Sequence, residues 1–260
     1  MEDDADFQRR ALVEAFGESS ESEEETHIAA DSSFLPTQER DHPKWEMVDG
    51  VKGLWTCPNF LSQKDQSLLL SAINREGWFS DTHNQAMRFG DLPEWAIDLS
   101  ILIREAVCSG EIDSLPGMTS TNEDQELCPL PLDLLWREPL FDQLIGNVYE
   151  PGEGICAHVD LLRFDDGIAI ISLESACVMH FTPSEPDGGC AETPEGEGSM
   201  TTPIPVYLKP GSLVLMSGEA RYLWKHGINR KDGCQLWEGK EIQQGRRTSV
   251  TLRKLCQSLN

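Results

Sequence analysis

The sequence predicts an α+β protein that is mainly β, with helices near the N-terminus followed by an antiparallel jelly roll. Two segments, residues 61–78 and 92–110, carry apolar side chains at helical spacing. After residue 130 the chain changes to short apolar runs separated by Pro and Gly, a pattern typical of antiparallel strands. Helices first and strands afterwards favour helices that flank and pack on one sheet.

An acidic tail is expected to precede this core. Residues 1–45 hold 13 acidic and four basic side chains and few large apolar ones. Such a segment cannot bury enough surface to offset its ordering entropy, so we expect it to be largely disordered. The folded domain is then expected to cover residues 46–260. Within it, the segment 183–203 is dense in Pro, Gly and acid and is expected to be a flexible loop.

The two helical segments have recognisable boundaries. In "LSQKDQSLLLSAINREGW", Ser62 is a suitable N-cap and Gly77 a suitable stop. In "LPEWAIDLSILIREAVCSG", Pro93 fits the first turn. The expected apolar stripes are Leu68, Leu69, Ala72 and Ile73 in the first helix and Trp95, Leu99, Leu102, Ile103, Ala106 and Val107 in the second.

The expected strands follow one another between turn signals. They lie in "DQLIGNVYE", "GIAIISL", "ACVMHF", "IPVYLKPGSLVLMSG", "RYLWKHGI" and "RRTSVTLRKL". In "RYLWKHGI" we expect His226 to end the strand, because Gly227 follows it as a turn residue.

Composition limits the classes of partner and compartment. The formal charge is −24, so a nucleic-acid partner would have to be held by a local basic patch. The eight cysteines form no CxxC pair, which disfavours structural zinc and a disulfide scaffold and indicates reduced thiols. The acidic start is unlike a targeting signal, and no apolar run approaches the ~18 residues of a membrane span. We therefore expect a protein of the cytoplasm, the nucleus or both, without membrane association.

The stretch "NVYEPGEGICAHVD" contains a candidate metal site. Residues two apart on a strand share a face, so His158 and Asp160 would converge on one point. His180 and His226 remain as sources of a third ligand, since the other histidines lie in the tail or in a loop. Two histidines and one carboxylate suit ferrous iron with open positions. The alternative is a hydrogen-bonded His and Asp at a strand end, and His180 is expected at the edge of the core.

The stretch "RRTSVTLR" adds a candidate anion site. Arg247, Ser249, Thr251 and Arg253 would share one face of an extended strand. Inward-facing arginines need an anionic partner, because a buried unpaired guanidinium is very costly. A dicarboxylate would provide one, since the planar fork of Arg matches a carboxylate. The alternative is an exposed strand face.

Together these motifs resemble the AlkB-like family of Fe(II)- and 2-oxoglutarate-dependent dioxygenases. The likeness spans residues 50–256 and rests on "NVYEPGEGICAHVD", "LKPGSLVLMSGEARYLWKHGI" and "RRTSVTLRK"; "NQAMRFG" and "GEARYLWKHGI" most resemble the branch that hydroxylates tRNA wobble uridines. The resemblance implies a double-stranded β-helix and iron ligands His158, Asp160 and His226. It further implies a 2-oxoglutarate site of Asn147, Tyr149, Arg247, Ser249 and Arg253.

The resemblance also implies the chemistry. Fe(II), 2-oxoglutarate and O2 would together hydroxylate a C–H bond with release of succinate and CO2, and a hydroxylated N-methyl group would be lost as an aldehyde. A lid from "REGWFSDTHNQAMRFG" would cover the site, with Trp78, Phe79 and Phe89 stacking on a base and Arg88 contacting phosphate. The alternative for these aromatic residues is a packed hydrophobic cap.

We therefore expect an enzyme that hydroxylates or oxidatively demethylates a nucleic-acid base in RNA or DNA, with RNA favoured. A separate RNA-binding or methyltransferase protein is a candidate partner. A protein hydroxylase or demethylase of the same fold is the rival enzyme, because an acidic surface suits a basic peptide. The third hypothesis is a non-catalytic AlkB-like scaffold. Against it stand the three candidate ligands and both arginines, for which a scaffold has no chemical need.

Overall fold

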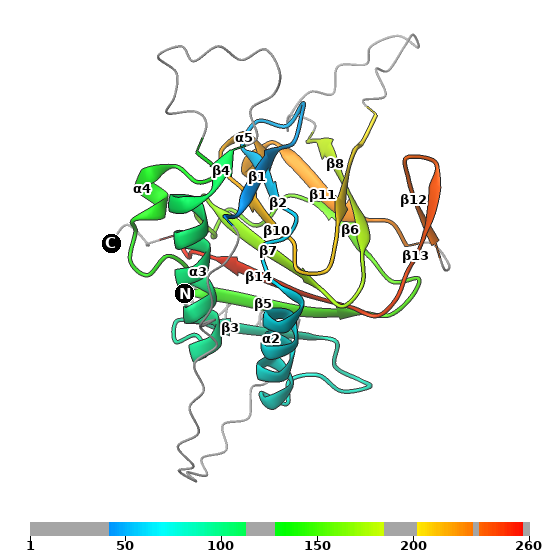
Figure 1. Cartoon of the computed structure of the whole chain (residues 1–260), viewed down its shortest axis with the longest axis horizontal. Helices are drawn as coiled ribbons and strands as arrows, with labels where there is room; N and C mark the ends of the chain where they lie inside the picture. Colours follow the sequence, from blue (N-terminus) through cyan, green and yellow to red (C-terminus); the bar gives the residue numbers. More distant parts are fainter. Residues whose placement is uncertain (1–41, 113–127, 185–201, 231–233, 257–260) are drawn as a thin grey trace, which may run out of the picture. The chain divides into compact units, whose positions relative to one another are not determined.

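Two sheets and a pair of helices form three layers in the computed structural model, which describes residues 42–112, 128–184, 202–230 and 234–256 (Figure 1). All of these residues belong to one compact unit. The expected disordered tail lies outside the described residues as far as residue 41, and the expected loop lies outside them from 185 to 201. None of the described helices is long and apolar enough to cross a membrane.

Among the described residues, the larger sheet has eight strands in the order β3-β5-β14-β7-β10-β2-β1-β4. Neighbouring strands run antiparallel, except that β1 pairs with β4 in parallel. The strands are β1 (Lys44–Met47), β2 (Leu54–Cys57), β3 (Gln85–Phe89), β4 (Glu111–Ile112), β5 (Gln143–Tyr149), β7 (Ile168–Leu173), β10 (Leu213–Met216) and β14 (Arg247–Arg253).

The smaller sheet has the order β6-β11-β8-β9 and is antiparallel throughout. Its strands are β6 (Ile155–His158), β8 (Cys177–Pro183), β9 (Ile204–Leu208) and β11 (Trp224–Ile228). A separate hairpin is formed by β12 (Cys234–Trp237) and β13 (Lys240–Gln243). The two facing sheets form a double-stranded β-helix, which confirms the mainly β class and the jelly roll predicted from the sequence.

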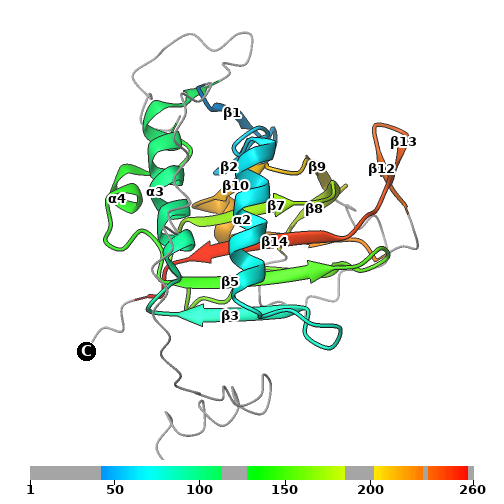
Figure 2. The same ribbon diagram turned by 60° about the horizontal axis from the view of Figure 1, so that its bottom comes forward.

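Two apolar cores hold the layers together. The core between the sheets includes Ile170 of the larger sheet and Phe181 of the smaller one. The core between the larger sheet and the helices includes Ile171 and Val250. Because successive side chains point to opposite faces, neighbours such as Ile170 and Ile171 contribute to different cores. The larger sheet is therefore buried on both faces over much of its width, and the helices α2 and α3 lie across one of them (Figure 2).

Helix α2 (Gln63–Arg75) begins where the sequence predicts. The Ser62 hydroxyl oxygen accepts a hydrogen bond from the Asp65 backbone N–H at 3.2 Å, and Gly77 follows the helix with a φ of 65°. The prediction for Leu68 was wrong: this residue is 44% exposed, because it lies about 100° round the helix from buried Leu69. The buried face consists of Asp65, Leu69, Ala72 and Ile73.

Helix α3 (Glu94–Ser109) follows Pro93, and its predicted apolar stripe is confirmed. The buried side chains of this stripe are Trp95, Leu99, Leu102, Ile103, Ala106 and Val107. Two short helices complete the described set, α4 (Leu132–Leu135) and α5 (Glu219–Tyr222).

The predicted strand in "RYLWKHGI" was wrong at both ends. Arg221 and Tyr222 belong to α5, and β11 continues through Gly227 to Ile228. Gly227 has no positive φ, so it does not serve a turn. A Cβ at this position would lie 2.8 Å from the backbone nitrogen of Ala157 on β6. The glycine therefore allows β6 and β11 to approach closely beside His226.

We expect Gly227→Ala to lower the free energy of unfolding by about 1–3 kcal/mol, because the added methyl group must push β6 away. Urea denaturation of the metal-free protein measures this change. Gly245→Ala is the matched control, since the Cβ there would meet only the side chain of Ser175, at 3.1 Å from Oγ; rotation of that side chain loses its hydrogen bond from the Gly245 N–H but moves no strand. Equal stability of the two variants would contradict the role assigned to Gly227.

Candidate metal centre and cosubstrate pocket

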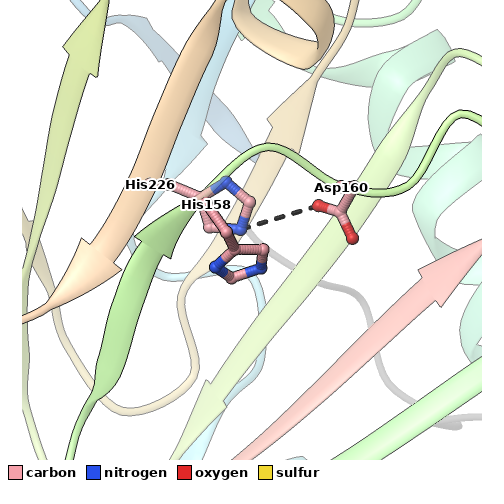
Figure 3. A group of neighbouring side chains, drawn as sticks. All are labelled: His158, Asp160 and His226. Atoms are coloured by element: carbon pink, nitrogen blue, oxygen red, sulfur yellow. Dashed lines mark ion pairs between the residues drawn. The ribbon is translucent and has the colours of Figure 1, made fainter. Parts of the chain in front are cut away.

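Two histidines and a carboxylate converge where β6 and β11 pair (Figure 3). His158 ends β6, His226 lies directly opposite it on β11, and Asp160 follows two residues after the end of β6. One potential ligand atom from each residue lies within 4.8 Å of the other two. The other candidate, His180, lies on β8 opposite Gly227 and is not part of this group.

Both imidazoles have a ring nitrogen directed to a possible metal position. The Nδ1 atom of His158 lies 2.9 Å from the carbonyl oxygen of Cys156, which can only accept, so Nδ1 donates and Nε2 is the nitrogen available to a metal ion. Burial lowers the pKa of His226 to about 4, although the charge of Asp160 acts in the opposite direction. His226 is therefore neutral near pH 7, which is the form that binds metals.

The carboxylate of Asp160 has one oxygen paired and one oxygen without a partner. Asp160 is 5% exposed, and its Oδ1 lies 2.5 Å from Nη2 of Arg253. Its Oδ2 faces Nε2 of His226 at 3.6 Å and has no hydrogen-bond partner among the described residues. An unsatisfied buried carboxylate oxygen is costly, and a cation held by the three side chains would satisfy it. Two nitrogens and one oxygen are a donor set that fits Fe(II).

Arg221 of α5 fixes the backbone that leads away from Asp160. It is 1% exposed, and it donates from Nη1 to Asp160 O at 3.0 Å and from Nη2 to Leu161 O and Phe164 O, each at 2.8 Å. Three carbonyl oxygens thus surround a buried cation that forms no ion pair with any described residue. Sequence reasoning missed this role, and the available signal was an arginine inside the otherwise apolar run "ARYLW".

A pocket lies beside Arg247 at the end of β14. The residues that line it are Tyr149, Glu150, Glu153, Ala176, Cys177, Ile228, Gln244, Gly245 and Arg247. Arg247 is 4% exposed; its Nε and Nη2 donate to Oγ of Ser172 at 3.0 and 2.7 Å, and its guanidinium lies 5.5 Å from the centre of the Tyr149 ring. Within the described ranges no carboxylate pairs with it. A buried guanidinium with spare donors beside a pocket is suited to a carboxylate ligand.

The remaining cosubstrate candidates share the face of Arg247. Ser249 lies opposite Asn147, just as Arg247 lies opposite Tyr149. Oδ1 of Asn147 accepts a hydrogen bond from Nε2 of Gln85 at 2.7 Å. The same face of β14 ends at Arg253, which pairs with the carboxylate of Asp160. The structure therefore brings together all five predicted cosubstrate residues, and it adds Ser172 and Gln85, which the sequence analysis did not identify.

The four predicted substrate residues divide between the two faces of the larger sheet. Phe89 lies opposite Gln143, on the metal-site face, and is 46% exposed. Arg88 points to the other face, where its guanidinium lies 4.6 Å from the centre of the Trp78 ring. Trp78 and Phe79 are partly buried against the core beneath the helices. Trp78 and Phe79 therefore pack as part of a hydrophobic cap, which is the alternative given for them above. Because side chains alternate along a strand, Arg88 points away from the metal site.

Comparison with known proteins identifies the family. The profile of the 2OG-Fe(II) oxygenase superfamily matches residues 115–253. A protein of Macaca fascicularis named tRNA (carboxymethyluridine(34)-5-O)-methyltransferase ALKBH8 is 30% identical over 233 residues, which are 79% of this chain and 31% of that protein. The alkylated DNA repair protein ALKBH8 homolog of Arabidopsis thaliana is 27% identical over 247 residues, covering 88% of this chain and 67% of that protein.

Among solved structures, OsALKBH1 is 13% identical, with a TM-score of 0.48 over 78% of this chain and 97% of that chain. The chain spans about a third of the length of the macaque relative. The superfamily match covers more than half of the chain and both halves of the site described above. The chain belongs to the 2OG-Fe(II) oxygenase superfamily and is a dioxygenase that uses Fe(II), 2-oxoglutarate and O2.

Proposed function

We propose that His158, Asp160 and His226 bind the iron, and that the enzyme hydroxylates or oxidatively demethylates a base in RNA. One observation carries the iron assignment: Oδ2 of Asp160 is buried without a hydrogen-bond partner among the described residues, it lies 3.6 Å from Nε2 of His226, and His158 completes the group of three potential ligands. A bound cation removes this electrostatic cost, because all three side chains can then act as ligands.

The same proposal assigns 2-oxoglutarate to the face of Arg247. Arg247 would hold the distal carboxylate with its guanidinium fork, with Tyr149 and Ser249 beside it. Asn147 and Arg253 would lie at the end nearer the iron, where Arg253 keeps Asp160 in position through its ion pair. When bound, Fe(II) and 2-oxoglutarate use O2 to oxidise a C–H bond of the substrate, with formation of succinate and CO2.

The nucleic-acid substrate is supported by the names of the relatives. One is named as a tRNA methyltransferase acting at a carboxymethyluridine and another as an alkylated DNA repair protein. RNA is favoured over DNA because the tRNA-directed relative matches at 30% identity. That relative is about three times as long as the matched region, so a separate RNA-binding or methyltransferase protein is a proposed partner. The rival substrate is a basic peptide, which the charge of −24 favours.

The metal and cosubstrate assignment predicts a spectroscopic result. Anaerobic addition of Fe(II) and then 2-oxoglutarate should give the weak visible charge-transfer band of the chelate. His158→Ala should lose this band, because a ligand is missing. Arg247→Ala should weaken 2-oxoglutarate binding by about 30-fold, which corresponds to about 2 kcal/mol for a charge-assisted contact.

Two matched variants act as controls for this titration. His83→Ala removes an exposed histidine of a turn, and Arg75→Ala removes an exposed arginine in the last turn of α2, away from the pocket. Both should bind as the parent does. No band in the folded, metal-loaded parent would overturn the assignment of the site.

Arg221→Met should weaken Fe(II) binding by at least about tenfold, because three carbonyl oxygens lose their donor and the Asp160 backbone is released. Co(II) titration measures the affinity, and thermal unfolding measures the accompanying loss of stability. Arg104→Met is the control, since Arg104 also donates to two backbone carbonyls, of Leu135 and Arg137. A loss of stability in both variants with metal affinity unchanged would contradict the positioning role.

The substrate class is tested by product analysis. The parent, incubated with unmodified and modified tRNA pools, should release succinate in step with a nucleoside that gains one oxygen or loses a methyl group. His226→Ala should release neither, because it lacks a proposed ligand. Mass spectrometry of the digested RNA identifies the product. Oxidation of a basic peptide library with no change in any RNA would replace this proposal with the protein hydroxylase.

A further inference from the structure

The segment that follows Asp160, residues 161–164, has a fixed backbone and exposed side chains; it is called the recognition loop below. Arg221 binds the carbonyl oxygens of Leu161 and Phe164. The backbone N–H of Cys256 donates to Arg163 O at 2.9 Å, and its thiol donates to Leu162 O at 3.3 Å. Leu161 and Leu162 are nevertheless 59% and 77% exposed. The chain thus holds an apolar and basic surface in place directly beside a metal ligand.

Arg163 is the cation of this loop, and aromatic rings are its neighbours. Its guanidinium lies 5.9 Å from the centre of the Phe89 ring and 5.1 Å from that of Phe164. The two carboxylates that follow in sequence bind elsewhere. Asp165 pairs with Arg137 at 3.7 Å, and Asp166 accepts the Gly218 N–H at 2.9 Å. Within the described part of the chain, no carboxylate forms an ion pair with Arg163.

We propose that Arg163 and Phe89 form a nucleotide-binding subsite at the mouth of the active site. Arg163 contacts a phosphate of the substrate strand, and the exposed face of Phe89 stacks on a base. This inference rests on the proposed function and narrows it to a single-stranded or flipped-out segment. Stacking with a nearby guanidinium is the common way in which proteins hold unpaired nucleotides.

The charge of the loop favours a nucleotide over a basic peptide. An exposed cation beside the metal site attracts phosphate and repels lysine and arginine side chains. The whole chain carries a formal charge of −24, so a local cation at the mouth has a large effect on which ligand can approach. The phosphate contact that the sequence predicted for Arg88 is here assigned to Arg163, because Arg88 points to the helix-covered face of the sheet.

The test measures binding of a fluorescein-labelled, single-stranded oligouridylate to the full chain loaded with Mn(II) and 2-oxoglutarate, over a range of salt concentrations. Arg163→Ala should weaken binding and reduce the slope of log K against log salt by about 0.7, the value for one phosphate contact on a single strand. Arg163→Lys should keep the slope. Phe89→Ala should weaken binding about fivefold or more with the slope unchanged, because stacking involves no counterion release.

Two further variants make the result specific. Arg75→Ala removes an exposed arginine at the end of α2 and should leave both affinity and slope as in the parent. Binding of 2-oxoglutarate, unchanged in Arg163→Ala, shows that the pocket is intact. If Arg88→Ala reduces the salt-dependence slope and Arg163→Ala keeps the slope of the parent, the inference is wrong but the proposed function stands. A parent that binds neither the oligouridylate nor unfractionated tRNA would overturn the proposed function and the inference with it.

Discussion

The buried carboxylate of Asp160 is the constraint on which the rest of the site depends. Removing a carboxylate from water costs several kcal/mol unless its charge and its lone pairs are compensated. Arg253 compensates one oxygen, and the other lies 3.6 Å from Nε2 of His226 without a hydrogen-bond partner among the described residues. The described residues therefore leave one oxygen of the buried carboxylate without compensation, and a divalent cation is the ligand that would best stabilise it. Metal binding and local stability are coupled through this one side chain.

Three arginines in the same region of a strongly acidic protein are held differently: Arg221 and Arg247 are buried and Arg253 is partly buried. Arg253 has the carboxylate, Arg221 has three backbone carbonyls, and Arg247 has the hydroxyl of Ser172 with donors left over. The Nε atoms of Arg221 and Arg253 are buried without a hydrogen-bond partner among the described residues, so an unsatisfied donor alone does not single out one arginine. Arg247 differs because neither a carboxylate nor a backbone carbonyl of the described residues is its partner and because it lies beside a pocket, which supports the proposal that the dicarboxylate binds there.

The sequence predicts those features that depend on local periodicity. It does not predict features that depend on how strands distant in the sequence pair with one another. Period-two alternation was enough to put Arg247 and Arg253 on one face, and helical spacing was enough for α3. The choice between His180 and His226 depends on which strand pairs with β6, and spacing along the chain carries no information on this. Arg88 was assigned to the substrate because its strand was not recognised, so its direction was unknown.

The histidines proposed to bind the metal and the residues proposed to bind the cosubstrate come from different sheets, so the packing of the core between the sheets sets their spacing. His158 and His226 belong to the smaller sheet, whereas Arg247 and Tyr149 belong to the larger one. Side chains between the sheets, such as Phe181 beside the His226 ring at 6.0 Å, set the distance between them. Because such a core is close-packed, a change in its volume moves one half of the site against the other. Residues that never contact a ligand can therefore control whether iron and 2-oxoglutarate are held at compatible positions.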